Sequence, residues 1–278
     1  MTTERYSYVD IHSHVNDARF DGDIASVLAR MRETEVASIV VGTDREMSAR
    51  AIVLAEAHDD LWATVGQHPT DRREEIFDEE WYAKHAKHPK VVAIGECGLD
   101  YFRLKDDREK GLLENMDREA DRQKELFERH MELAVSVDKP LMIHGRPESK
   151  SMDAYEDLLY ILKNGQKAYG EKVRGNVHFF VGNIEIAKQF LDLGFTMSFT
   201  GVLTFTHDYD EMVRYIPLES IHAETDAPYV APAPYRGKRN EPAFVAETVK
   251  AIARIKNEDQ EKTRKILLEN ARRVFLTP

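Results

Sequence analysis

The sequence predicts an α/β protein with a single domain, a (β/α)8 or TIM barrel that covers residues 1–278. The length of 278 residues suits such a barrel, which typically needs about 250. Short apolar runs rich in β-branched residues alternate with longer stretches of helical period, and no low-complexity linker divides them. Repeated strand-then-helix units favour a parallel barrel over two domains. An open, doubly wound sheet is the alternative, but the Gly-rich nucleotide loop that it needs is absent.

Each predicted strand is a short run of apolar residues, many of them β-branched or aromatic, because such side chains fit a pleated and buried surface. In chain order, these runs are Tyr8 to His12, Ala37 to Val41, Leu61 to Val65, Val91 to Gly95, Pro140 to His144, Gly175 to Phe179, Phe195 to Thr200 and Ile221 to Asp226.

Two helices stand out, from Arg118 to Val137 and from Asp259 to Phe275, because apolar residues recur there at helical spacing. Two longer stretches interrupt the regular alternation, Asp100 to Glu119 after the fourth strand and Asp226 to Asn240 after the eighth. Since both follow the carboxyl ends of strands, we expect them to lie over the barrel mouth.

The composition excludes several classes of function. The formal net charge is -11, which argues against a protein that binds nucleic acid through a large basic surface. It does not argue against an enzyme that binds a few phosphates locally. The single cysteine, Cys97, excludes an intrachain disulfide framework and cysteine-rich zinc sites, so histidine and carboxylate must hold any metal. No apolar run is long enough to span a membrane and the first residues do not resemble a secretory signal. We expect a cytoplasmic protein with no membrane partner.

The first strand carries polar residues in an alternating pattern. Strand side chains point to opposite faces in turn, so Asp10, His12 and His14 are expected to share one face while Val9 and Ile11 point toward the helices. Two imidazoles at this spacing can reach one metal, although the same pattern also occurs on polar strand edges.

Four other strands end in a polar residue, namely Glu96, His144, His178 and Asp226. Each has an ordinary structural explanation, such as an acid paired with a lysine, a hydrogen-bonded core histidine or a helix N-cap. Because all of them stand at carboxyl ends of predicted strands, where barrel enzymes build active sites, we interpret them together as one site.

The ordered motifs DIHSH, GQHP, IGECGLDY, MIHGR, VHFFVG, SFTGVLTF and ETDAPY, followed by KRNEP, resemble the TatD family of metal-dependent deoxyribonucleases within the amidohydrolase superfamily. The resemblance covers nearly the whole chain. It implies two divalent metal ions, the first bound by His12, His14 and Asp226, the second by His144 and His178, with Glu96 bridging them.

Metal preference gives two conflicting indications. Four imidazoles and two carboxylates suit zinc, manganese or iron better than magnesium, whereas the family resemblance implies magnesium dependence. We expect magnesium or manganese to support activity, and zinc or iron to be present in the protein as isolated.

Two ions held in this way activate water for attack at phosphorus. We expect Asp226 to accept the proton of that water as general base, with Glu96 as the second catalytic carboxylate. Arg146 is a candidate clamp for a substrate phosphate or a surface arginine, and His68 either lies near substrate or caps the third strand. Asp10 and Glu224 are expected to orient the metal ligands rather than bind metal.

The chain departs from the pattern of the family at positions that do not bind metal. Phe179 stands where a cysteine is common and Val181 where a threonine is usual. The segments 106–121 and 147–154 are extended. These departures affect the predicted substrate preference, since both segments feed the barrel mouth.

We expect a deoxyribonuclease that trims single-stranded DNA from its 3′ end, that binds DNA weakly and transiently, and that is a monomer. The acidic net charge predicts binding that fades with salt. The alternative is a metal-dependent ester hydrolase of another class, such as a deacylase of mischarged tRNA or a phosphotriesterase-like enzyme. A third possibility is a non-catalytic binding barrel with an idle site.

Overall fold

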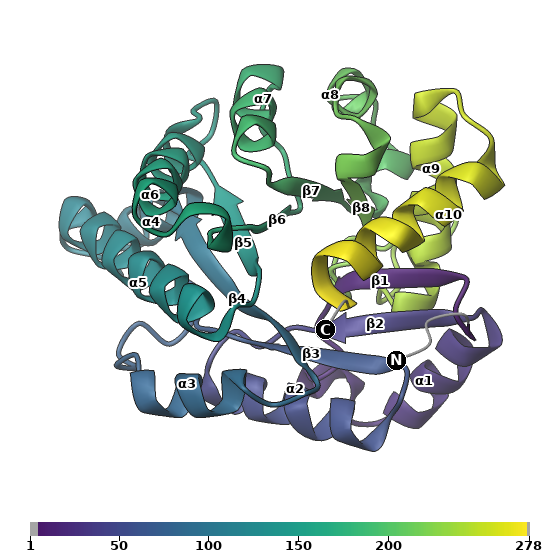
Figure 1. The fold of residues 1–278 in the computed structure, drawn as a ribbon, viewed down its shortest axis with the longest axis horizontal. Helices are drawn as coiled ribbons and strands as arrows, with labels where there is room; N and C mark the ends of the chain where they lie inside the picture. Colours follow the sequence, from purple (N-terminus) through teal and green to yellow (C-terminus); the bar gives the residue numbers. More distant parts are fainter. Residues whose placement is uncertain (1–4, 277–278) are drawn as a thin grey trace.

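Eight parallel strands, paired in chain order from β1 to β8, curve into an almost closed barrel with helices outside it (Figure 1). This arrangement, seen in a computed structural model that describes residues 5–276, is the predicted TIM barrel. No helix in residues 5–276 is both long enough and apolar enough to cross a membrane.

The strands are β1 (Tyr8–Ser13), β2 (Val36–Val40), β3 (Leu61–Val65), β4 (Val91–Asp100), β5 (Leu141–Arg146), β6 (Gly175–His178), β7 (Thr196–Phe199) and β8 (Ile221–Ala223). The α-helices are α1 (Ile24–Glu33), α2 (Arg45–Ala57), α3 (Glu79–Ala86), α4 (Tyr101–Glu109), α5 (Met116–Val137), α6 (Asp153–Tyr169), α7 (Ile184–Asp192), α8 (Asp210–Tyr215), α9 (Val245–Lys256) and α10 (Gln260–Ala271). Short 3-10 turns cover Ala18–Phe20, Gly170–Lys172, Gly201–Thr204, Leu218–Ser220 and Pro242–Phe244, and a π-turn covers Arg272–Leu276.

The stretch after the fourth strand contains regular structure that was not assigned from the sequence. β4 continues to Asp100 because its second half pairs with β5, and the chain then enters α4 directly, capped by the Asp100 carboxylate. Segment 106–121 is therefore the end of α4, a turn and the first turns of α5, and segment 147–154 leads from β5 into α6. In contrast, β8 ends at Ala223, so Asp226 lies beyond the strand rather than on it.

The barrel interior has an apolar side and a polar side. Asn176, Thr196, Ser198, His222 and Glu224 on the polar side form an unbroken series of hydrogen bonds across β6, β7 and β8. The apolar side is a buried cluster from β1 to β5, closed by residues of the C-terminal helices: Val9, Ile11, Ala37, Ile39, Trp62, Ala93, Met142, Leu268, Ala271 and Phe275.

The predicted orientation of the first strand is wrong for three residues. Val9 and Ile11 belong to the interior cluster, not to the helix side, and Asp10 points away from the site. The pairing of β1 with β2 shifts register between Asp10 and Ser13. Such a bulge breaks the alternation, so that both Ile11 and His12 face the interior.

The gap between β8 and β1 is closed mainly by residues next to the predicted site. The Asp10 carboxylate accepts hydrogen bonds from the Thr225 backbone N–H at 2.9 Å and the Thr225 hydroxyl at 2.5 Å. The His14 N–H donates to the Ala227 carbonyl at 2.7 Å, and the Asp226 N–H donates to the His12 carbonyl at 2.9 Å. Closure of the barrel therefore places the ends of β1 and β8 together.

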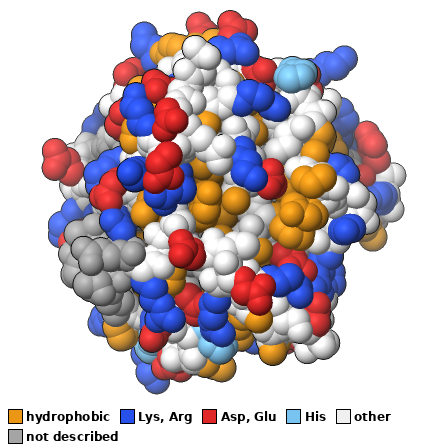
Figure 2. Space-filling model, turned by 90° about the vertical axis from the view of Figure 1, so that its right-hand side faces the viewer, with side chains coloured by type: hydrophobic (Ala, Val, Ile, Leu, Met, Phe, Trp, Pro, Cys, Tyr) orange, Lys and Arg blue, Asp and Glu red, His pale blue; other side chains and the backbone are white. Residues whose placement is uncertain are grey.

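The surface carries mixed charge on the face shown in Figure 2, which is the right-hand side of Figure 1. Acidic and basic side chains are interspersed there, and neither sign gathers into one broad patch. This face therefore presents no broad basic patch to a polyanion.

Gly98 allows β4 and β5 to approach closely. Its φ is +141°, and an added Cβ would lie 2.0 Å from the His144 carbonyl oxygen. We predict that Gly98→Ala lowers the free energy of unfolding by about 3 kcal/mol or more, measured by urea denaturation. The control Gly22→Ala, where no atom lies within 4 Å, should change it by less than about 0.5 kcal/mol; equal effects would contradict this account.

His130 on α5 holds the end of β3 through its ring. Its Nε2 accepts a hydrogen bond from the Gln67 N–H at 2.9 Å, and its Nδ1 lies 2.7 Å from the Leu126 carbonyl. Burial lowers the pKa of His130 to about 4, so the neutral ring is the folded form and stability is lost as pH falls.

We predict that His130→Gln, which does not titrate, reduces the loss of unfolding free energy between pH 6.5 and 4 by about 3 kcal/mol relative to the unsubstituted protein. Urea denaturation across this pH range measures the difference. Identical pH profiles would show that His130 is not responsible.

Candidate metal centre

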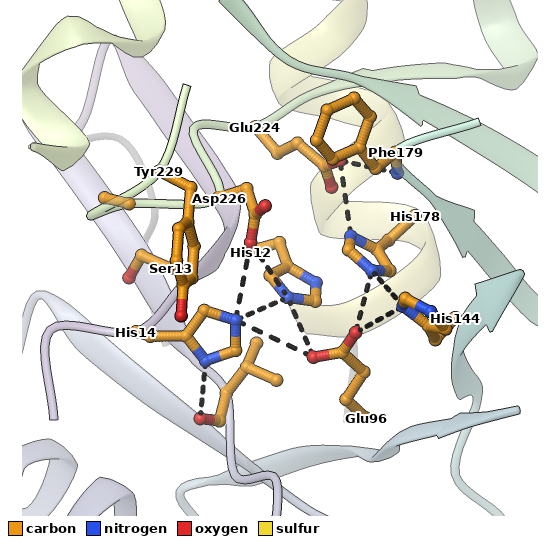
Figure 3. Close-up of polar contacts among 12 residues, drawn as sticks. His12, Ser13, His14, Glu96, His144, His178, Phe179, Glu224, Asp226 and Tyr229 are labelled. Atoms are coloured by element: carbon orange, nitrogen blue, oxygen red, sulfur yellow. Dashed lines mark hydrogen bonds and ion pairs between the residues drawn. The ribbon is translucent and has the colours of Figure 1, made fainter. Parts of the chain in front are cut away.

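Two groups of three ligand atoms share the carboxylate of Glu96 (Figure 3). The Glu96 Oε2 lies 3.4 Å from the Nε2 atom of His12 and 3.7 Å from that of His14. The Glu96 Oε1 lies 2.9 Å from the Nδ1 atom of His144 and 2.8 Å from the Nε2 atom of His178. The buried cluster is therefore consistent with a binuclear metal site in which one carboxylate reaches both positions.

The ring nitrogens of the cluster face one another, as expected of ligands around a cation. The Nε2 atoms of His12 and His14 are 3.1 Å apart, and the His144 Nδ1 and His178 Nε2 are 3.3 Å apart. Two neutral imidazoles cannot both donate into such a contact, so either a proton or a cation must lie between their lone pairs. The donor set of imidazoles and carboxylates suits a divalent ion of the zinc, iron or manganese type.

Opposite charges dominate the electrostatics of the cluster. Burial raises the pKa of Glu96, but the nearby imidazoles of His178 and His12 outweigh burial and hold this pKa well below its ordinary value. Burial lowers the pKa of His144, whereas its hydrogen bonds with Asp100 and Glu96 together raise it to about 9. An ionised carboxylate at the centre favours a cation beside it.

Asp226 completes the first group of ligands from beyond β8. Its Oδ1 lies 3.4 Å from the His14 Nε2 and 3.9 Å from the His12 Nε2. Its Oδ2 has no hydrogen-bond partner within residues 5–276 and the residue lines the cavity above the cluster. The left-handed backbone of Asp226, with φ of +53°, aims the carboxylate back over the cluster.

The two predicted orienting residues lie behind the cluster. The Asp10 carboxylate also accepts from the His12 N–H at 3.2 Å, so it ties β1 to the segment that carries Asp226. The buried Glu224 Oε1 lies 3.5 Å from the His178 Nδ1 and accepts from the Phe179 N–H at 2.6 Å, while Oε2 accepts from the Ser198 hydroxyl at 2.6 Å. Both carboxylates therefore contact the backbone or ring of a cluster histidine, and Glu224 also forms a further group of possible ligands with His12 and His178.

The cluster forms the floor of a cavity of about 910 Å³ at the barrel mouth, and both predicted substrate-binding residues line this cavity. The His68 Nε2 lies 3.8 Å from the Glu96 Oε1, and its Nδ1 lies 3.2 Å from Asp71. The exposed Arg146 guanidinium lies 4.1 Å from the centre of the Phe102 ring and makes no hydrogen bond or ion pair with the described part of the chain.

Two residues near the cluster were not singled out from the sequence. Asp100 lies 3.2 Å from the His144 Nε2 and joins a further group of possible ligands with His68. Its position at the end of a long β4 was hidden because the predicted strand stopped at Gly95. Tyr229 lines the cavity, and its ring centre lies 6.4 Å from that of His14. A tyrosine in a loop gives no signal in sequence without that geometry.

The chain matches the family described as TatD related DNase over residues 9–276. It is 37% identical over 270 residues to the uncharacterized metal-dependent hydrolase YabD of Bacillus subtilis, covering 96% of this chain and 98% of that protein. It is 31% identical over 276 residues to the uncharacterized metal-dependent hydrolase YcfH of Escherichia coli, covering 96% and 95%. The crystal structure of YjjV, a TatD homologue from Escherichia coli, superimposes with a TM-score of 0.81 at 26% identity, covering 98% of this chain and 99% of that chain. Together with the buried His/Glu cluster, these similarities show that the chain is a metal-dependent hydrolase of the TatD-related DNase family.

Proposed function

We propose that the protein hydrolyses phosphodiester bonds of DNA, trimming single strands from the 3′ end. The observation that carries the proposal is the single Glu96 carboxylate, whose two oxygens face two separate histidine groups on the floor of an open cavity. His12, His14 and Asp226 would hold one ion, His144 and His178 the other, with Glu96 between them. When bound, two divalent ions activate water and stabilise the charge of an in-line displacement at phosphorus.

The residues of the chain supply orientation and a proton acceptor. The Asp226 Oδ1 contacts the histidines, while its Oδ2 has no partner among residues 5–276. This second oxygen can therefore accept a proton from the attacking water as a general base. Asp100 and Glu224 orient the rings of His144 and His178, because each contacts the ring nitrogen that does not face Glu96.

Two divalent cations held in the cavity would favour a polyanionic substrate over a neutral ester. Arg146 and Arg103 line it, and neither guanidinium is paired with a carboxylate within residues 5–276. Most other described arginines are paired, for example Arg73 with Asp107 and Glu119. Guanidinium groups that have no carboxylate partner and lie near the metal cluster can bind the phosphates on either side of the scissile bond.

The test is a 5′-labelled single-stranded oligonucleotide incubated with the protein and magnesium or manganese. A ladder of products shortened from the 3′ end is expected, and an intact strand together with hydrolysis of aminoacyl-tRNA or a phosphotriester would identify the other hydrolase class. Elemental analysis of the protein as isolated is expected to find zinc or iron.

We predict that Asp226→Asn lowers kcat for this oligonucleotide by about a hundredfold or more, since it removes the proton acceptor. Its metal content, measured by elemental analysis, should stay close to that of the unsubstituted protein. Full turnover by this variant would exclude Asp226 as the base.

We predict that Arg146→Ala raises KM for the oligonucleotide by about tenfold, with a much smaller change in kcat, because one phosphate contact is lost. The slope of log affinity against log salt concentration should become shallower by about one. Arg174→Ala is the control, since Arg174 directly precedes β6, does not line the cavity and pairs with Asp138. Equal KM changes in both variants would argue against a phosphate contact at Arg146.

A further inference from the structure

The cavity above the metal cluster has two unlike walls. The wall that follows β4 and β5 includes Arg103 and Arg146, together with Asp100 and Asp107, which pair with His144 and Arg73. The opposite wall, which follows β6, β7 and β8, is aromatic and aliphatic, formed by Phe179, Val181, Tyr209, Tyr229 and Val230. A ligand that fits both walls has a planar apolar group on one side and a second anionic group on the other.

Phe179 is turned into this cavity by its backbone. Its φ of +45° is in the left-handed region, which is uncommon for a bulky residue. In a regular strand the residue after His178 would point to the helix side, where its neighbours Val177 and Phe180 are buried in the core. The backbone turn at Phe179 instead leaves its ring partly exposed at the cavity wall.

The turn at Phe179 is held by a buried anion. The Phe179 N–H donates to Glu224 at 2.6 Å, and Glu224 is fixed from its other oxygen by Ser198. Left-handed backbone in a residue of this size costs of order 1–3 kcal/mol and persists only where the surroundings enforce it. A strained position at a binding wall is typical of a functional constraint.

The Phe179 ring is a candidate stacking surface at the cavity wall. Within residues 5–276 its ring contacts one other ring, that of His178, nearly at a right angle with the ring centres 6.4 Å apart, and the side chain is partly exposed. Tyr229, on the other side of the cluster in Figure 3, is covered on its ring by Arg19 at 4.4 Å and bonded to it through its hydroxyl.

We propose that Phe179 is a specificity-determining residue that stacks on the base of the 3′-terminal nucleotide, the one whose 5′ phosphate lies on the metal cluster. This inference rests on the proposed phosphodiesterase function and names a contact that selects nucleotides over simple phosphate esters. Stacking of a base on an aromatic side chain changes affinity by about tenfold.

The test compares two chromogenic diesters with the same leaving group, thymidine 5′-(p-nitrophenyl phosphate) and methyl p-nitrophenyl phosphate. We expect Phe179→Leu to lower kcat/KM for the thymidine ester by about tenfold and to leave the methyl ester unchanged. Leucine keeps the bulk and carries the same backbone strain, so only the aromatic face is lost. Phe179→Tyr, which keeps the ring, should restore the preference. Tyr160→Ala, an exposed aromatic on α6 outside the cavity, is the control and should change neither rate.

A binding measurement on metal-loaded protein separates this inference from the proposed function. Calorimetry with thymidine 5′-phosphate and methyl phosphate is expected to show that Phe179→Leu weakens only the nucleotide, by about tenfold. Equal losses for both ligands, or none for either, would overturn the role of Phe179. If the unsubstituted protein hydrolyses neither diester, the proposed function fails, and the binding comparison still decides whether Phe179 contacts the base.

Discussion

The hydrogen bonds between Asp10 and Thr225 close the barrel, and the metal cluster depends on that closure. The other neighbouring strands are joined by parallel ladders, whereas β8 and β1 meet through this buried carboxylate and two backbone hydrogen bonds around the bridge of Ser13 and Ala227. His12 and His14 lie on one side of this junction and Asp226 on the other. The geometry of the first ligand group is therefore set by how the barrel closes rather than by any one strand.

The two sides of the barrel interior have different tasks. The apolar side, from β1 to β5, gives the barrel a packed core of the usual kind. The polar side replaces apolar packing with hydrogen bonds that run from His222 and Thr196 up to Glu224. Each of these bonds satisfies a buried polar group, and together they fix the carboxylate that contacts His178 and Phe179. The interior thus supports the second ligand group from below.

The barrel, the strand positions and the six residues of the cluster could be predicted from the sequence, because each polar residue interrupts an apolar run at the same end of the sheet. What could not be predicted is how several of them reach the centre. His12 and Glu96 lie where strand pairing shifts register, and Asp226 and Phe179 have left-handed backbones. Strict alternation, the rule used for Asp10, fails at such irregular positions, which concentrate at functional sites. The extension of β4 to Asp100 could not be predicted either, because Glu96 and Gly98 interrupt the apolar run that indicates a strand.

The two halves of the cluster differ in how much chain must fold before they exist. His144 contacts Glu96 and His178 across 48 and 34 residues of sequence, within three neighbouring strands. The junction that brings His12 and His14 to Asp226 joins residues 215 apart. Contacts across longer loops cost more chain entropy and tend to form later. The second ligand group therefore requires only β4, β5 and β6 to be paired, whereas the first requires the whole barrel to close.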